Sequence, residues 1–381
     1  MGCRLCLTVA ALAAVVQLGF PSMAMGQGRP ADGLTDGGEL FTAGCAGCHG
    51  PEGAGAADST VGFEKPGTYP DFTSCSQTSP EVQADWRAVI HDGGTARGFS
   101  RIMPAFSGVL RADQIAALAQ YIRSLCDDRA WPAGELNLPR PLITEKAFPE
   151  SETVIASTVG PSSSGTRGHD ATTALQYERR FGARNQIELS VPLAVMHDPS
   201  GTTLGGVGDV EAGLKHVLWS SMRTGTIVSV QGVLTLPSGD SDRGLGTGTT
   251  IFEGFGAFGQ MFARDSFLQG QAGVERGKDS DLAPSAGFLR LAGGKSFRAG
   301  DGRGRMWTPM LEFIANRDFV SEASADIDLV PQVQVTLSQR QHVRGAVGVQ
   351  VPITNRADRP KQVGFYILWD WFDGGLFSGW K

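Results

Sequence analysis

The run Cys45-Ala46-Gly47-Cys48-His49 constrains this chain of 381 residues more than any other feature. Two cysteines three positions apart, followed directly by a histidine, have the C-x-x-C-H spacing of covalent haem attachment. On one helical turn each thiol can bond one vinyl group of a haem, and His49 then lies beneath the iron as the proximal ligand. The motif predicts one covalently bound haem c on Cys45, Cys48 and His49. A structural disulfide or a zinc site is the alternative.

The first residues predict export from the cytoplasm. The chain starts with a short basic region that contains Arg4, and an apolar run follows at residues 5–20. Ser22-Met23-Ala24 then has the small-x-Ala form of a cleavage site. The apolar run is shorter than the roughly 20 residues of a membrane-spanning helix. We therefore expect a signal peptide at residues 1–24, with a retained anchor as the alternative. Export agrees with the haem motif, because such haems are attached outside the bacterial cytoplasm.

Four cysteines remain after removal of the signal peptide, and two of them lie outside the haem motif. These two are Cys75 and Cys126. Disulfides persist in exported compartments, so this pair is a candidate disulfide. Two buried free thiols are the alternative.

Length, net charge and hydrophobic content favour some classes of protein and exclude others. A length of 381 residues suits two domains, and the net charge of -6 with unclustered basic residues predicts no nucleic-acid binding. A hydrophobic content of 41% indicates a folded chain rather than a disordered one.

Residues 34–128 predict an all-α domain. Its last helix places Ile115, Leu118, Ala119, Ile122 and Leu125 at helical spacing. Met103, followed by Pro104, is the only methionine of this region and is the candidate sixth ligand of the iron. His91 is its rival, and two-histidine ligation would lower the reduction potential relative to His/Met ligation.

The order of helix, C-x-x-C-H, loop, Met-Pro and closing helix resembles the class I cytochrome c family over the whole of residues 34–128. The closing pattern Leu118-Ala119-Gln120-Tyr121-Ile122 belongs to the same resemblance. It implies a haem edge exposed for electron exchange and an iron without an open position for substrate. The expected role is that of an electron carrier rather than an enzyme.

Residues 129–150 are expected to form a Pro-rich linker, because three prolines between Trp131 and Pro141 cannot continue a helix. From residue 151 to 381 the pattern changes to alternation with a period of two, which is typical of strands. One strand shows it clearly, with an apolar face of Ile187, Leu189, Val191, Leu193 and Val195. The opposite face of such segments is small or polar.

Alternation alone fits both a soluble sandwich and a membrane barrel, because each buries one face. About a dozen alternating segments follow residue 152, many of about 9 to 14 residues, and a tilted strand needs roughly 9–11 residues to cross a bilayer. Soluble strands average about 5–6 residues. We therefore predict a transmembrane antiparallel β-barrel of about 12 strands at residues 151–381.

The runs Gly206–Val210, Pro237–Asp240 and Arg243–Gly248 resemble outer-membrane transporter-like barrels of the phenol-degradation meta-pathway type. The resemblance implies a porin-like or transporter-like barrel and carries no catalytic residues. Four histidines of this half lack metal-ligand spacing and are expected to be solvated or lumen-facing: His169, His197, His216 and His342.

Together these features predict an outer-membrane protein whose cytochrome domain lies in the periplasm, docked at the barrel mouth or swinging on its linker. Its expected activity is electron transfer at the periplasmic face, with periplasmic electron-transfer proteins or small redox solutes as partners, and with a pore as a further element. One alternative is a soluble periplasmic electron-transfer subunit whose β-domain binds substrate. Another is a passive outer-membrane transporter with a cytochrome docking module.

Overall fold

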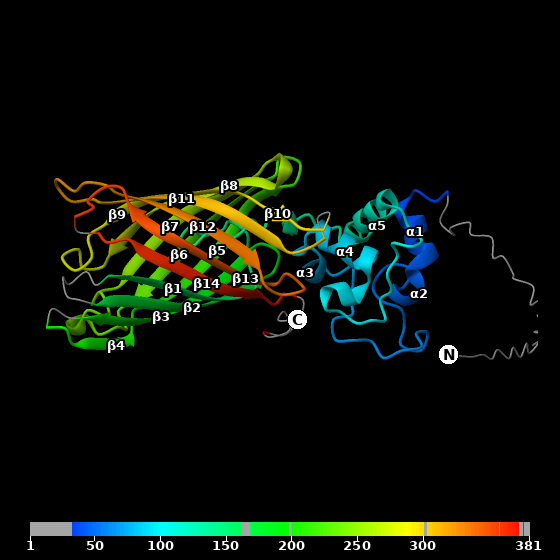
Figure 1. Cartoon of the computed structure of the whole chain (residues 1–381), viewed down its shortest axis with the longest axis horizontal. Helices are drawn as coiled ribbons and strands as arrows, with labels where there is room; N and C mark the ends of the chain where they lie inside the picture. The colour runs from blue at the N-terminus through cyan, green and yellow to red at the C-terminus, as the bar shows by residue number, and fades with distance from the viewer. Residues whose placement is uncertain are drawn as a thin grey trace, which may run out of the picture.

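The computed structural model describes residues 33–161, 168–197, 200–300, 303–357, 359–372 and 376. The predicted signal peptide lies outside them. A helical domain and a β-barrel follow each other along the long axis of the molecule, with the helical domain at one end of the barrel (Figure 1). Among the described residues no helix is long and apolar enough to cross a membrane.

The helical domain has three helices of 8 to 13 residues and shorter pieces around them. The α-helices are α1 (Gly37–Gly44), α2 (Ala46–His49), α3 (Cys75–Thr78), α4 (Gln83–Asp92) and α5 (Ala112–Ser124), and the 3-10 turns are η1 (Gly94–Arg97) and η2 (Gly134–Leu136). Asp36 caps α1, since its Oδ1 accepts from the amides of Gly38 (2.9 Å) and Glu39 (3.0 Å). Gly37 allows α1 to meet α5, because a Cβ there would lie 2.4 Å from the carbonyl oxygen of Ala117. The predicted apolar face of α5 is buried in this contact.

The second half forms β1 (Glu152–Pro161), β2 (His169–Phe181), β3 (Asn185–His197), β4 (Thr203–Val207), β5 (Val210–Ser221), β6 (Thr226–Leu236), β7 (Ile251–Met261), β8 (Ser266–Gly277), β9 (Ala286–Lys295), β10 (Phe297–Arg298), β11 (Met306–Asp318), β12 (Asp326–Thr336), β13 (Val343–Pro352) and β14 (Gln362–Asp370). Short 3-10 turns η3 (Ser241–Arg243) and η4 (Ala263–Asp265) lie in its connections. All neighbours pair antiparallel, and β14 pairs with β1 while β9 pairs with β11. Because β4 continues β5 along β3, and β10 continues β9 along β11, the sheet closes as a ring of twelve strands. The predicted fold class is confirmed.

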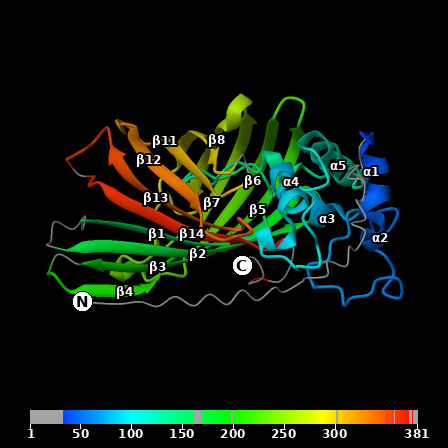
Figure 2. The same ribbon diagram turned by 45° about the vertical axis from the view of Figure 1, so that its right-hand side comes forward.

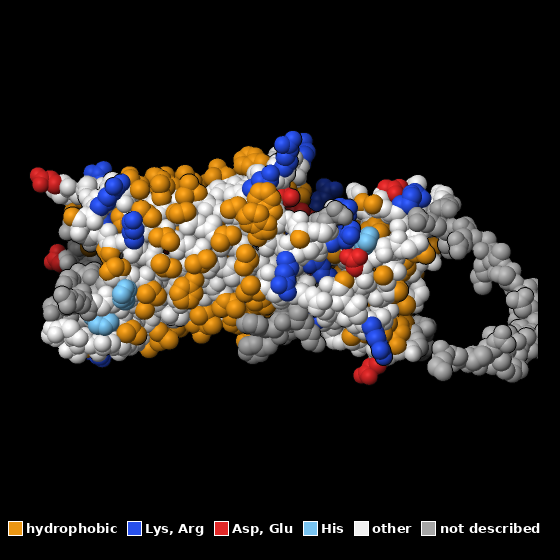
Figure 3. Space-filling model, viewed as in Figure 1, with side chains coloured by type: hydrophobic (Ala, Val, Ile, Leu, Met, Phe, Trp, Pro, Cys, Tyr) orange, Lys and Arg blue, Asp and Glu red, His pale blue; other side chains and the backbone are white. Residues whose placement is uncertain are grey.

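The barrel is apolar outside and polar inside. Leu175 and Leu189 point outward with 47% and 46% of their surface exposed, whereas the inward-facing Glu178 and Glu312 are fully buried. Hydrophobic side chains cover the middle of the barrel surface, and charged ones gather toward its ends (Figure 3). This is the reverse of a soluble domain, in which burial favours apolar groups.

Residues 136–150, which we call the plug segment, run inside the barrel. Phe148 packs against Val217 and Ile227, near the end of the barrel that carries the helical domain. Leu142 reaches further in, where a Cβ on Gly348 would lie only 2.7 Å from its Cδ1. The predicted linker therefore connects the domains but is not an exposed tether: it enters the lumen and returns to begin β1.

Side chains of the barrel wall satisfy the backbone of the plug segment. Glu312 accepts from the amides of Leu142 (2.7 Å) and Thr144 (2.9 Å). Gln269 donates to the carbonyl of Pro139 at 2.7 Å, and Gln186 accepts from the amide of Glu150 at 2.7 Å. Irregular backbone at membrane depth is tolerated only where protein or water satisfies it, and here the lumenal side chains do so.

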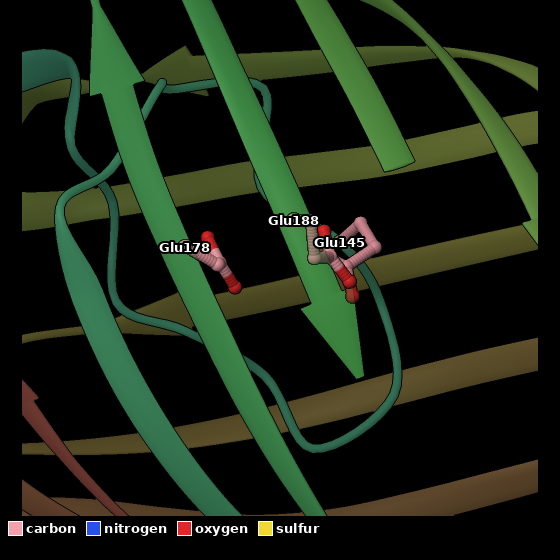
Figure 4. A group of neighbouring side chains, drawn as sticks. All are labelled: Glu145, Glu178 and Glu188. Carbon is pink, nitrogen blue, oxygen red and sulfur yellow. The ribbon is translucent and has the colours of Figure 1, made fainter. Parts of the chain in front are cut away.

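An ion network fixes the same segment. The guanidinium of Arg140 donates to Glu152 (2.7 Å) and Glu178 (2.6 Å), and both carboxylates are fully buried. The carboxylate oxygens of Glu145, Glu178 and Glu188 lie within 4.8 Å of one another (Figure 4). Arg140 also lies 3.5 Å from Glu145, so it contacts two of these three acids directly. We interpret the group as part of the anchor of the plug segment.

Candidate haem pocket and domain junction

The C-x-x-C-H motif lies where α1 passes into α2. Cys45 is the C-cap of α1 and the N-cap of α2, and its carbonyl accepts from the amide of His49 at 2.9 Å. This single turn holds the cysteine and histidine side chains together. Cys45 is buried and Cys48 is exposed, and both are free thiols.

These residues line a cavity of 260 Å³ in the helical domain. Its walls include Phe63, Tyr69, Phe72, Trp86, Ile90, Phe99 and Phe106 together with Cys45, Cys48, His49 and Met103. The mixture of aromatic and aliphatic walls suits a porphyrin ring, which is apolar over most of its surface. The structure thus brings all four predicted haem residues to one cavity.

His49 is prepared to act as a metal ligand. Its ring lies 4.7 Å from that of Phe72 and 5.4 Å from that of Tyr69, measured between centroids. Its buried Nδ1 has no hydrogen-bond partner within the described part of the chain. Burial lowers the pKa of His49 to about 4, so the imidazole is neutral near pH 7 and can bind iron. Burial, with Cys48 nearby, raises the pKa of the Cys45 thiol to about 11.

A tight loop presents Met103 to the cavity. The amide of Gly94 donates to the carbonyl of Met103 at 3.0 Å, and a Cβ on Gly94 would lie 2.3 Å from the carbonyl oxygen of Ser100. His91, the rival ligand, does not line the cavity, and its Nδ1 pairs with the Asp92 carboxylate. Of the two candidate ligands, Met103 therefore lines the cavity and His91 does not.

The structure joins Cys75 and Cys126 in a disulfide whose Cα atoms are 5.2 Å apart. The bond ties the start of α3 to the chain just after α5. It leaves Cys45 and Cys48 as the free pair of the described chain.

The helical domain lies at one end of the barrel (Figure 2), where residues of β10, of the β10–β11 turn and of the β12–β13 turn contact it. The charged contacts across this junction join Arg298 to Asp85 (3.4 Å), Arg303 to Asp92 (3.2 Å) and His342 to Glu81 (2.9 Å). Of the two placements expected from the sequence, docking at the mouth is the one observed. The prediction that His342 is solvated or lumen-facing is wrong, because the docked domain covers its turn and leaves it 2% exposed.

Two acids at the junction differ in their pKa. Burial alone would raise the pKa of Glu81, but the charge and hydrogen bond of His342, with Arg344 and Arg97, lower it below the usual range. Burial, together with the neighbouring Glu81, raises the pKa of Asp85 despite Arg298 and Arg97.

Sequence reasoning missed the plug segment and the residues that form the junction. One signal for the plug was present, since a segment of this length without regular structure is uncommon in a compact protein unless it has a role of its own. Charged residues within it, such as Arg140 and Lys146, were a second signal. Nothing in the local pattern indicated that the turn at residues 337–342 touches the helical domain.

Residues 34–126 match the family model described as cytochrome c. Among solved structures, an outer membrane channel from Pseudomonas putida F1 is 13% identical and covers 61% of this chain and 99% of its own, with a TM-score of 0.42. The KdgM porin is 10% identical and covers 58% of this chain and 99% of its own, with a TM-score of 0.39. None of the curated protein sequences matches the chain. The cytochrome c assignment rests on the sequence match, and the barrel assignment rests on the strand pairing itself.

Proposed function

We propose that this chain, which carries a cytochrome c domain at residues 34–126, is an electron carrier fixed to the outer membrane by its barrel. A cytochrome c domain implies haem c and electron transfer. Cys45 and Cys48 would each add their S–H across one haem vinyl group, and His49 and Met103 would hold the iron. An iron held by both side chains would have no free position for substrate, which suits electron transfer rather than catalysis.

The observation that carries this proposal is a cytochrome domain docked on a barrel with an apolar exterior and a filled lumen. Apart from β4 and β10, the strands have 9 to 13 residues, which is the length that tilted strands need to cross a bilayer. The apolar exterior speaks against a soluble subunit. The plug segment speaks against a passive transporter, because solute flux would require its displacement.

The lengths of the connections support a periplasmic position for the cytochrome domain. Turns at its end of the barrel are short, as at residues 182–184 and 222–225, whereas the far end carries the long connection at residues 237–250. Bacterial outer-membrane barrels have short periplasmic turns and longer extracellular loops. The longer turns at the near end, residues 299–305 and 337–342, contain Arg303 and His342, which contact the cytochrome domain.

Electron exchange would then occur on the periplasmic side. The turn of α2 that carries the exposed Cys48 lies on the side of the domain away from the barrel (Figure 1). A haem bound there would present its thioether edge to periplasmic carriers or to small redox solutes. A single haem is too short to conduct across a membrane about 40 Å thick, headgroups included.

Cell fractionation tests the proposal. The full chain is expressed with haem-maturation machinery, and gels of soluble, inner-membrane and outer-membrane fractions are stained for haem with and without boiling. We expect full-length haem protein in the outer membrane, with a mobility that changes on boiling. Haem protein confined to the soluble periplasm would overturn the anchoring role.

A Cys48→Ser variant tests the haem attachment in the same cells. Loss of one thioether bond should shift the pyridine haemochrome spectrum toward that of a singly attached haem. An unchanged spectrum would rule out the assigned motif. The exposed Ser76→Ala is a matched control outside the cavity.

A further inference from the structure

Among the described residues of the barrel, one lines the candidate haem pocket. Arg340 lies in the β12–β13 turn and is only 4% exposed. Its Nη2 donates to the carbonyl of Gly98 at 3.2 Å, and its guanidinium lies 4.4 Å from the ring centroid of Phe99. These contacts hold a cationic group of one domain at the cavity wall of the other.

Other donors of the cytochrome domain line the same cavity. Arg97 of η1 is 4% exposed and is oriented by Asp85, whose carboxylate accepts from it at 2.9 Å. The indole Nε1 of Trp86 is buried and has no hydrogen-bond partner within the described part of the chain. The cavity thus offers two guanidinium groups and one indole N–H in a wall that also contains the carboxylates of Glu81 and Asp85.

This donor set matches carboxylates. Guanidinium groups bind carboxylates with charge-assisted, often bidentate hydrogen bonds, and an indole can only donate. The two acids that line the same cavity already have partners, since Glu81 pairs with His342 and Asp85 pairs with Arg298 as well as Arg97. A haem c has an apolar ring and two propionate carboxylates, so it fits a cavity with one cationic side.

We propose that Arg340 is a haem-binding residue supplied by the barrel: with Arg97 it binds the haem propionates, so that the barrel completes the haem site. The inference rests on the proposed attachment of haem at Cys45 and Cys48. A positive charge near the iron favours the reduced state, which carries one positive charge fewer. Docking on the barrel therefore raises the reduction potential of the cytochrome.

The test uses the full chain purified in detergent with its haem attached. Arg340→Gln removes the charge, and Arg340→Lys keeps it. Arg303→Gln is the matched control, because Arg303 belongs to the same junction, contacts Asp92 and does not line the cavity. The readouts are the midpoint potential from spectroelectrochemistry and the propionate bending bands in resonance Raman spectra.

We expect Arg340→Gln to lower the midpoint potential and to shift the propionate bands. Arg303→Gln should leave both readouts at their wild-type values, and Arg340→Lys should fall between. If Arg340→Gln retains its haem and its heat-modifiable barrel, but matches the wild type in potential and Raman bands, the inference is overturned. Absence of haem from the wild-type protein would instead overturn the proposed function.

Discussion

At the scale of single residues, the loop between α4 and α5 places one of the two candidate ligands in the cavity wall. His91 lies in the last turn of α4 and pairs with Asp92, and it does not line the cavity. Met103 lies on a loop held by Gly93 and Gly94, and Gly93 has a positive φ of 83° that favours glycine. The choice between the two ligands therefore depends on backbone conformation and not on residue type.

We predict that Met103→Ala loses the weak red absorption band of Met-ligated ferric haem and lowers the reduction potential, because thioether ligation raises it. Absorption spectra and a redox titration check this. Met222→Ala, a change at an exposed site of the barrel, should alter neither. Persistence of the band in Met103→Ala would place the ligand elsewhere.

At the scale of elements, the plug segment is held by ions whose partners come from different strands. Arg140 binds carboxylates of β1 and β2, while Glu312 of β11 accepts from the backbone at residues 142–144. A cavity of 220 Å³ remains between this segment and the strands β1, β2 and β14. The plug segment thus fills much of the lumen and crosslinks the wall.

Arg140→Ala should destabilise the barrel by about 3–5 kcal/mol, because it leaves two buried carboxylates without their guanidinium. On gels, the temperature at which the folded protein takes the mobility of the boiled protein should fall. Ion current through planar bilayers should increase. Arg129→Ala, at an exposed position just before the plug segment, is the control. Equal transition temperatures and currents in the two variants would contradict the anchoring role of Arg140.

The disulfide is a second constraint at this scale. It closes a separation of 51 residues around most of the cytochrome domain. The double variant Cys75→Ser/Cys126→Ser should lower the free energy of unfolding of this domain by about 4 kcal/mol on the chain-entropy model. Urea unfolding followed by haem absorbance measures the difference. A change below about 1 kcal/mol would show that the unfolded domain is not restricted by the bond.

At the scale of the whole molecule, we expect the stability of docking between the cytochrome domain and the barrel to depend on pH through Glu81. Its pKa is lower in the docked state, so the contact with His342 contributes fully above the ordinary carboxyl range. The contribution is lost as the pH falls through the lowered value. Asp85 acts in the opposite sense, since its raised pKa means that protonation relieves a cost of burial.

Comparison of the wild type with a Glu81→Gln variant separates the contribution of Glu81 to docking from that of Asp85. We predict faster hydrogen exchange of the α4 amides in this variant than in the wild type at neutral pH, because the domain undocks more often. The difference should vanish in acid, where the wild-type carboxyl is also neutral. Glu64→Gln, at an exposed position, should behave as the wild type throughout. Equal exchange in Glu81→Gln and the wild type at neutral pH would refute the role of this contact.

The features that could be predicted from the amino-acid sequence are those that depend on residues close together in the chain. C-x-x-C-H needs only one helical turn to bring its side chains together, and alternation with a period of two needs only a pleated strand to separate two faces. A dozen such strands with an apolar outer face then predict a closed barrel, because closure leaves no unpaired edge in lipid.

The path of residues 136–150 and the junction between the domains depend on contacts between residues far apart in the sequence, which are seen only in the folded molecule. Leu142 meets Glu312, which is 170 residues away in sequence, and Arg340 meets Gly98 across 242 residues. No local period encodes such pairs, and a proline-rich segment with mixed polarity has the same pattern whether it spans solvent or fills a lumen. Its place follows from the inward-facing polar side chains of the barrel wall, which need hydrogen-bond partners. These side chains surround one lumen only after the ring of strands has closed.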